Sequence, residues 1–121
     1  MLEEGRHYPK MNGKLVFKWA VEKMPEISSE ALKATGIGVG DLAWFVPHQA
    51  NLRINELVAR RLEIPDEKCW NNIVRYGNTT AATIPMGLSE LVHQKKTKAG
   101  DLILMAAFGA GFTWGSAIVR M

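Results

Sequence analysis

Apolar residues recur along the chain with two different periods, and the period changes several times. From Asn12 onward, apolar side chains return every three or four residues while lysines and glutamates occupy the opposite face, which is typical of an amphipathic helix. Pro25 interrupts this pattern. We therefore expect one helix before the proline and a second helical piece that begins near Ser28 or Ser29.

Three glycines follow at residues 36, 38 and 40, and their G-x-G-x-G spacing is also found in phosphate-binding loops. Such a loop follows a strand and opens a helix. Here the glycines follow a helical stretch and precede a strand-like run. We therefore interpret them as a helix C-cap and a turn.

The rest of the chain alternates between short apolar runs and helical patterns. The runs are almost wholly apolar, as expected of buried strands. Apolar strands that alternate with helices predict an α/β layered domain. The expected elements are a strand at 42–47, a helix at 50–62, a short strand or extended link at 69–74, a helix from about 83, a strand at 102–108 and a final strand at 112–119.

Composition narrows the class of protein. The chain has 121 residues, a formal charge of +3 and one cysteine, which suit one small domain in a reducing cytoplasm. No apolar run approaches the ~18 residues that a membrane span needs. We expect an irregular polar lead-in at 1–11 without the apolar segment of a signal peptide, a domain at 12–121, and no membrane contact.

Two uncharged donors stand where a strand is expected to give way to a helix. His48 ends one apolar strand, and Asn78 follows Gly77 in the turn before another helix. Ligands of α/β folds gather at the carboxyl ends of strands. A neutral imidazole and a carboxamide that converge can form an oxyanion hole. Spacing alone leaves a structural alternative open. His48 could be a buried histidine bonded to a backbone carbonyl, and Asn78 could merely fill a positive-φ position in a turn.

Three motifs carry a family resemblance: HQANLR at 48–53, GNTTAA at 77–82 and AFGAGFTWGSA at 107–117. In order and spacing they closely resemble the C-terminal half of ketoacyl-acyl-carrier-protein synthase III, a thiolase-like condensing enzyme. The match runs from about Met11 to Met121. The resemblance implies half of a thiolase-like layered fold, with a mixed sheet flanked by helices.

The resemblance also implies a reaction. Such enzymes condense an acyl-coenzyme A primer with malonyl-acyl-carrier protein at the start of fatty acid biosynthesis, with a coenzyme A thioester as substrate and no further cofactor. His48 and Asn78 fall on the family's catalytic pair, which stabilises the enolate formed on decarboxylation. The loop Gly109, Ala110 and Gly111 falls on the segment whose backbone N–H stabilises the oxyanion of the acyl step.

Partner sites are implied in the same way. The family's carrier-protein-binding segment corresponds to Gln49, Ala50, Asn51, Leu52 and Arg53, with Arg60 or Arg61 beside it. The pantetheine channel corresponds to Met11 and Gly13, with Ala50, Asn51 and Phe108 as further candidates. The family's complete enzymes imply a homodimer.

The chain departs from the family in its nucleophile. Cys69, its one cysteine, lacks the small-residue helix start of an active-site cysteine, so we expect a structural thiol. We therefore expect a C-terminal piece of a condensing enzyme that is inactive alone. We also expect it to lack a first strand, which would lie between the His48 strand and the strand from Leu102.

Other functions are less well supported. A non-catalytic module that binds acyl carrier protein would keep the docking helix without the nucleophile. A metal-dependent hydrolase could use His7, His48 and His93, but no acidic or histidine ligand stands three or four residues after His48, so no metal is expected. A nucleic-acid module is disfavoured because the basic residues are scattered.

Overall fold

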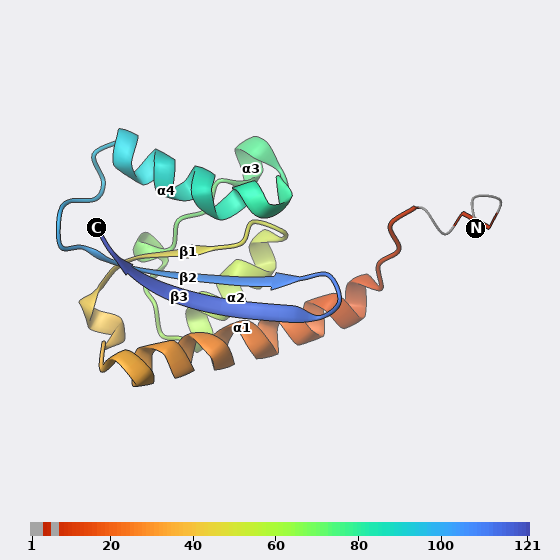
Figure 1. Ribbon diagram of the computed structural model, residues 1–121, viewed down its shortest axis with the longest axis horizontal. Coiled ribbons are helices and arrows are strands. Elements are labelled where there is room, and N and C mark those ends of the chain that lie inside the picture. The colour runs from red at the N-terminus through yellow and green to blue at the C-terminus, as the bar shows by residue number, and fades with distance from the viewer. Residues whose placement is uncertain (1–3, 6–7) are drawn as a thin grey trace.

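Three strands form one mixed sheet, and helices cover both of its faces (Figure 1). The computed structural model describes residues 4–5 and 8–121. Strand β1 (Leu42–Pro47) runs parallel to the central strand β2 (Leu102–Gly109), and β3 (Thr113–Arg120) pairs with β2 in the antiparallel direction. The α/β class with a mixed sheet is therefore confirmed.

In the described part of the chain, four α-helices surround this sheet, and short 3-10 turns connect several of the elements. Helices α1 and α2 pack on one face, and α4 packs on the other (Figure 1). The helices are α1 (Gly13–Thr35), α2 (Leu52–Arg61), α3 (Ile73–Tyr76) and α4 (Thr83–His93), and the 3-10 turns are Val39–Asp41, Asp66–Lys68 and Thr80–Ala82.

Alternate residues of the strands supply the two halves of the core. Phe45 and Leu104 point toward α1 and α2, whereas Val46 and Ile103 point toward Leu91 of α4. All five side chains are fully buried. A strand that is buried on both faces needs apolar residues at successive positions, which explains the apolar runs in the sequence.

Helix α1 passes through Pro25 without a break, so the expectation of two helical pieces was wrong. A proline inside a helix leaves the carbonyl four residues earlier without its N–H partner. Here that carbonyl belongs to Val21, and a guanidinium N–H of Arg61 donates to it at 2.6 Å. A cation from α2 thus replaces the missing backbone donor.

The glycine run at 36–40 is a cap and a turn, as predicted. Gly36 ends α1 with φ of 68°, and the N–H of Ile37 donates to Leu32 O at 3.2 Å. This is the left-handed C-cap that glycine favours. The chain then passes through the Val39–Asp41 turn directly into β1.

The segment at 69–74 is extended only at its start. Cys69 forms a parallel bridge with Phe45, and the N–H of Trp70 donates to Phe45 O at 2.8 Å. The chain then turns into α3 (Ile73–Tyr76), where we expected a continued strand or link.

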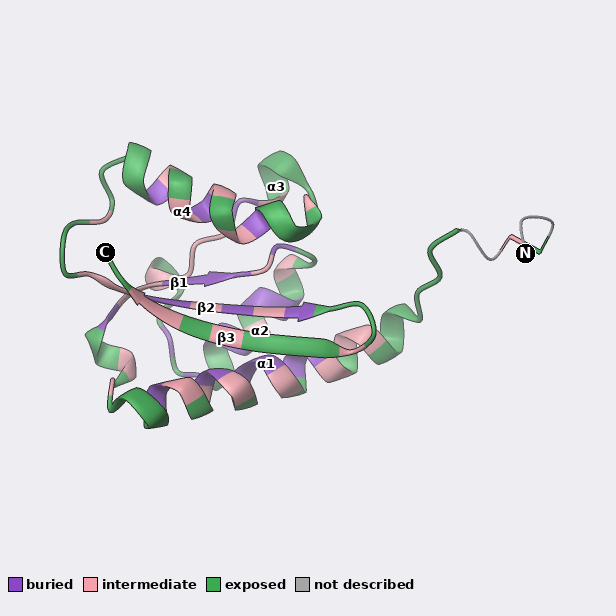
Figure 2. Ribbon diagram, viewed as in Figure 1, coloured by how far each residue is buried: buried purple, intermediate pink, exposed green. Residues whose placement is uncertain are grey.

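The expected gap between the His48 strand and the next strand does not exist. Strands β1 and β2 are direct hydrogen-bonded neighbours, with Phe45 opposite Leu104 and Pro47 opposite Ala106. The expectation of an intervening strand was therefore wrong. Among the described residues, no strand pairs with the outer edge of β3, and Figure 2 shows most of that strand as exposed or intermediate.

Candidate active site at the carboxyl ends of the parallel strands

The two predicted donors belong to one end of the molecule. The carboxyl ends of β1 and β2 and the start of α4 lie on the same side (Figure 1). His48 follows β1 directly, and its backbone N–H donates to Ala106 O at 2.8 Å. This bond extends the β1–β2 ladder by one residue and fixes the backbone from which the imidazole projects.

The His48 ring lies against the first residue of α4. Its Nδ1 is 2.6 Å from Thr83 Oγ1, and the Thr83 residue is 3% exposed. The imidazole itself is half-buried, and this burial lowers the pKa of His48 below its usual range. Loss of solvent disfavours the charged form. The ring is therefore neutral at physiological pH, as the sequence led us to expect.

A narrow apolar crevice opens beside the ring. Its volume is about 20 Å³. Besides His48 it is lined by Val16, Ala20, Met24, Ala50, Ile54 and Phe108. Apolar walls strengthen any hydrogen bond that His48 makes to a ligand, because they exclude water and lower the local dielectric.

Asn78 presents its amide at the surface. Its Oδ1 accepts a hydrogen bond from the N–H of Thr80 at 2.9 Å, which forms an Asx turn. The carbonyl end of the side chain is thereby occupied, and the NH₂ end is left to donate. The positive φ angles of this turn belong to Gly77 and Thr80, so Asn78 does not fill a left-handed position.

The loop at 109–111 connects β2 to β3 and is held from both sides by aromatic rings. The Phe108 ring stacks on Trp114 at 6.2 Å and contacts Phe112 at 5.5 Å, and Trp19 of α1 lies 6.0 Å from Phe112. Gly111 has φ of 75°, which favours glycine. We did not predict this aromatic cluster, although FGAGFTW supplies three of its four rings, and Trp19 joins them from α1.

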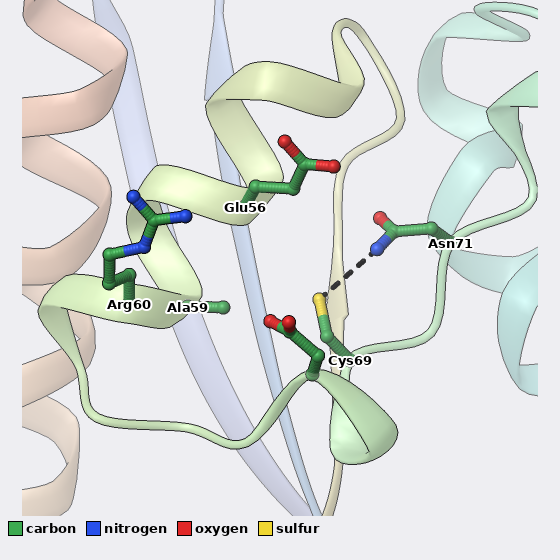
Figure 3. A pocket seen from close by; sticks show the side chains of 6 residues that line it. Glu56, Ala59, Arg60, Cys69 and Asn71 are labelled. Carbon is green, nitrogen blue, oxygen red and sulfur yellow. Dashed lines mark hydrogen bonds between the residues drawn. The ribbon is translucent and has the colours of Figure 1, made fainter.

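A larger cleft lies elsewhere and contains neither donor. It measures about 330 Å³ and lies between α2 and the Asp66–Lys68 turn (Figure 3). Cys69 lines it, and the Asn71 amide donates to its sulfur at 3.4 Å. Burial raises the pKa of the Cys69 thiol to about 11. Because the thiolate is the nucleophile, the raised pKa favours the structural thiol that we expected.

Neither a metal centre nor a membrane helix emerges from the described part of the chain. Within residues 4–5 and 8–121, no three His, Cys, Asp or Glu side chains gather as a metal site would need. His93 contacts its own helix, with Nδ1 2.8 Å from Ser89 O, and His7 lies outside the described residues. None of the described helices has the length and apolarity of a membrane span.

Comparison with known proteins identifies the family. The model of the 3-oxoacyl-[acyl-carrier-protein] synthase III C-terminal family matches residues 32–121. The chain belongs to this family. A similar curated relative is the beta-ketoacyl-[acyl-carrier-protein] synthase III of Roseiflexus sp. (strain RS-1), 51% identical over 120 residues. The chloroplastic synthase III B of Cuphea wrightii is 51% identical over 110 residues, which are 91% of this chain and 27% of that protein.

Solved structures agree with the family assignment. The 3-oxoacyl-[acyl-carrier-protein] synthase III of Aquifex aeolicus VF5 superposes with a TM-score of 0.92 at 46% identity, over 94% of this chain and 37% of that one. The alignment to the Roseiflexus relative covers 99% of this chain and 36% of the relative. The chain thus spans about a third of the length of synthase III proteins.

The segment that we expect to bind carrier protein in this family is mixed in exposure. Ala50, Asn51 and Arg53 are exposed, and Leu52 is partly exposed. Asn51 caps α2, since its Oδ1 accepts from the N–H of Arg53 at 3.0 Å. Gln49 is 1% exposed and cannot contact a partner directly in this structure.

Gln49 instead connects β1 to the loop that leads to Asn78. Its Oε1 accepts from the N–H of Asn72 at 3.0 Å and of Ile73 at 3.2 Å, while its Nε2 donates to Pro47 O at 2.9 Å. This role could not be predicted from local pattern, because the bonds to Asn72 and Ile73 reach more than twenty residues along the chain.

The remaining candidates, for the pantetheine channel and for carrier-protein binding, differ in whether they line the crevice beside His48. Phe108 lines the crevice beside His48, as a channel wall should. Met11 is 77% exposed on the segment before α1, Gly13 is the first residue of that helix, and neither lines the crevice. Arg60 lines the larger cleft, and Arg61 is bonded to Val21 O.

Proposed function

We propose that this chain supplies the decarboxylating half of a synthase III active site, and that in the complete enzyme it condenses an acyl-coenzyme A primer with malonyl-acyl-carrier protein. The observation that carries the proposal is the neutral, half-buried His48 at the carboxyl end of β1, fixed by Thr83 at the start of α4, the helix that follows Asn78. The family membership supports the same reaction class.

In the proposed step, His48 and Asn78 donate N–H groups to the thioester oxygen of the malonyl group. The bond between the malonyl Cα and its carboxylate breaks, carbon dioxide leaves, and the electron pair becomes an enolate that the two donors stabilise. The Cα then attacks an acyl thioester on a cysteine, whose thiolate leaves. A donor aimed at the developing oxyanion contributes roughly 3 kcal/mol.

The attacked thioester is not carried by Cys69 in this proposal. Burial raises the pKa of that thiol to about 11, which opposes formation of the attacking thiolate. A backbone N–H of the loop Gly109, Ala110 and Gly111 stabilises the oxyanion of the acyl step, and all three residues are exposed in the hairpin loop.

Carrier protein docks on the exposed residues Ala50, Asn51 and Arg53, with Leu52 beside them. The Arg53 guanidinium lies 5.9 Å from the Phe17 ring, which holds its charge on the surface next to the crevice. An acidic helix is the complementary partner for such a cation. The proposal includes a homodimer as the complete enzyme, a cytoplasmic location, and no cofactor beyond the coenzyme A thioester.

The test uses a chimera in which this chain replaces the corresponding segment of the Roseiflexus relative. His48→Ala should lower malonyl decarboxylation roughly 10²- to 10³-fold, while acylation from acetyl-coenzyme A stays within about twofold, the scatter expected of a change outside that step. His93→Ala is the matched control, because that imidazole is exposed and contacts only its own helix.

Equal loss of both steps in His48→Ala would assign the histidine a structural role and overturn the mechanism. The isolated 121-residue chain should transfer no acyl group from acetyl-coenzyme A, and turnover above the blank would contradict the assignment of Cys69. A folded chimera that binds carrier protein but neither acylates nor decarboxylates would favour the non-catalytic binding module.

A further inference from the structure

The strongest unexplained contact at the site joins His48 to a threonine. Thr83 Oγ1 and His48 Nδ1 are 2.6 Å apart, with Thr83 3% exposed and His48 half-buried. A neutral imidazole carries one proton on either Nδ1 or Nε2, and the partner of one nitrogen decides which. The direction of this hydrogen bond therefore decides whether Nε2 can donate to a ligand.

We propose that Thr83 is a positioning residue, whose hydroxyl donates to His48 Nδ1 and thereby holds the ring as the tautomer that carries its proton on Nε2. The consequence for catalysis rests on the proposed function above. The direction of the bond does not, because it follows from the hydrogen-bond inventory of the two side chains.

That inventory favours the hydroxyl as donor. Within the described residues, Thr83 Oγ1 has no other hydrogen-bond partner. If Nδ1–H donated to Thr83, the buried hydroxyl proton would have no acceptor, which costs about 1–3 kcal/mol. If the hydroxyl donates, Nδ1 is satisfied as an acceptor and the hydroxyl proton has a partner.

A second threonine shows what the hydroxyl does elsewhere in this fold. Thr35 donates to the carbonyls of its own helix, Ala31 O at 2.8 Å and Leu32 O at 3.1 Å. Within the described residues, Thr83 Oγ1 makes no such bond to a carbonyl of the preceding turn. Its proton is therefore available for His48.

The other ring nitrogen is left open for a ligand. The His48 backbone is fixed by its bond to Ala106 O, and its Nδ1 edge is fixed by Thr83. Nε2 lies on the opposite edge of the ring, and in the described part of the chain no protein group bonds to it. Thr83 thus selects the tautomer whose free edge is an N–H donor, which an oxyanion site requires.

The test is NMR of the isolated, ¹⁵N-labelled 121-residue chain at about pH 8, above the ordinary histidine pKa. Two-bond nitrogen–proton spectra report which imidazole nitrogen is protonated, and His7→Gln and His93→Gln variants identify the other two rings. We expect Nε2 of His48 to be protonated and Nδ1 to accept a hydrogen bond. A protonated Nδ1 in the unaltered chain would overturn the proposal.

Matched variants then test the cause. Thr83→Ser keeps the hydroxyl and should leave the ¹⁵N chemical shifts of His48 Nδ1 and Nε2 unchanged. Thr83→Val removes the hydroxyl and should change both chemical shifts. Thr35→Val makes the same chemical change far from the site and should leave His48 unchanged. If the His48 ¹⁵N chemical shifts are unchanged in a folded Thr83→Val chain, Thr83 does not set the tautomer and the proposal is wrong. If that variant does not fold, the unaltered chain and Thr83→Ser still decide.

The chimera adds the functional readout. Thr83→Val should lower kcat for malonyl decarboxylation roughly 10- to 100-fold, as expected for loss of a group that orients a functional histidine, with little change in KM, and Thr83→Ser should restore it. An equal loss in acylation would mean a purely structural role. If the chimera is inactive while the NMR result holds, the proposed function fails and the Thr83 assignment stands.

Discussion

At the scale of single residues, side chains from distant parts of the chain complete hydrogen bonds that the backbone leaves open. Pro25 has no N–H to offer Val21 O, and Arg61 donates to that carbonyl at 2.6 Å. An unmet buried carbonyl costs about 1–3 kcal/mol, which the guanidinium avoids. Arg61 therefore links α2 to the middle of α1 and has a structural role in addition to its charge.

This link predicts a coupling between two substitutions. Arg61→Met should lower the free energy of unfolding by about 1 kcal/mol, the usual net contribution of such a bond. In a Pro25→Ala background the loss should be smaller, because the substituted alanine supplies its own backbone N–H to Val21 O. Urea denaturation of the four chains measures both effects, and Arg60→Met serves as the control. An equal loss in both backgrounds would contradict the link.

The burial of His48 predicts a pH dependence of stability. Burial holds the pKa of His48 below its value in the unfolded chain, about 6.5. Below that pH the unfolded chain binds more protons than the folded one, so stability falls as the pH drops. Denaturation at a series of pH values should show a shallower fall between about pH 6.5 and 5 for His48→Gln. Parallel curves for the two chains would refute this prediction.

The sequence predicted the two donors but not the groups that hold them. His48 stands at a strand–helix junction, which local periodicity can locate, whereas Asn78, which we expected at a second such junction, lies between α3 and the Thr80–Ala82 turn. Thr83 reaches His48 from thirty-five residues away, and Gln49 reaches Asn72 from twenty-three. Gln49 was expected on a docking surface because it falls in the family's carrier-protein-binding segment. It is buried because its amide completes backbone bonds of a loop that periodicity does not place.

At the scale of elements, the position of α4 depends on one close approach to β1. A Cβ added at Gly87 would lie 2.9 Å from Val46 Cγ1 and 3.3 Å from Trp70 Cδ1. Real contacts of this kind are not that short, so α4 or β1 would have to move apart. Since α4 carries Thr83 at its start, this approach also sets where Thr83 meets His48.

Gly87→Ala should therefore destabilise the chain although alanine favours helices. The gain in helix propensity is about 1 kcal/mol, and overpacking a core contact costs about 1–3 kcal/mol. We expect a lower melting temperature for Gly87→Ala. Gly13→Ala, in a helix and with no atom near its added Cβ, should be neutral or stabilising. A stabilised Gly87→Ala chain would show that α4 is free to shift.

Element types followed from periodicity, whereas their connections did not. The strands at 42–47 and 102–108 were predicted within a residue, because burial on both faces makes them apolar throughout. The break at Pro25 was wrong because a remote arginine compensates for the proline. The order of neighbouring strands was also wrong, since pairing partners leave no mark within a single strand.

At the scale of the whole molecule, the side of the sheet away from α1 is incompletely covered. The outer edge of β3 has no strand partner among the described residues, and Ala117 of that strand is exposed. Apolar side chains are also exposed near α3 and α4, with Val74 86% and Val92 48% exposed. Open edges and apolar surface are features that folded proteins ordinarily cover.

The isolated chain should therefore associate with itself as its concentration rises. Backbone N–H and C=O groups along the β3 edge can pair with the same edge of a second copy, and burial of exposed apolar surface adds to the attraction. Sedimentation analysis from micromolar to millimolar concentration should show a mass above that of the monomer. Ala117→Lys places a charge on β3 and should weaken association, because lysine on an edge strand opposes pairing. Ala34→Lys adds the same charge at the exposed end of α1 and should leave association unchanged. A monomer throughout that range would contradict the self-association. Equal effects of the two lysines would mean that the copies associate through a surface other than the β3 edge.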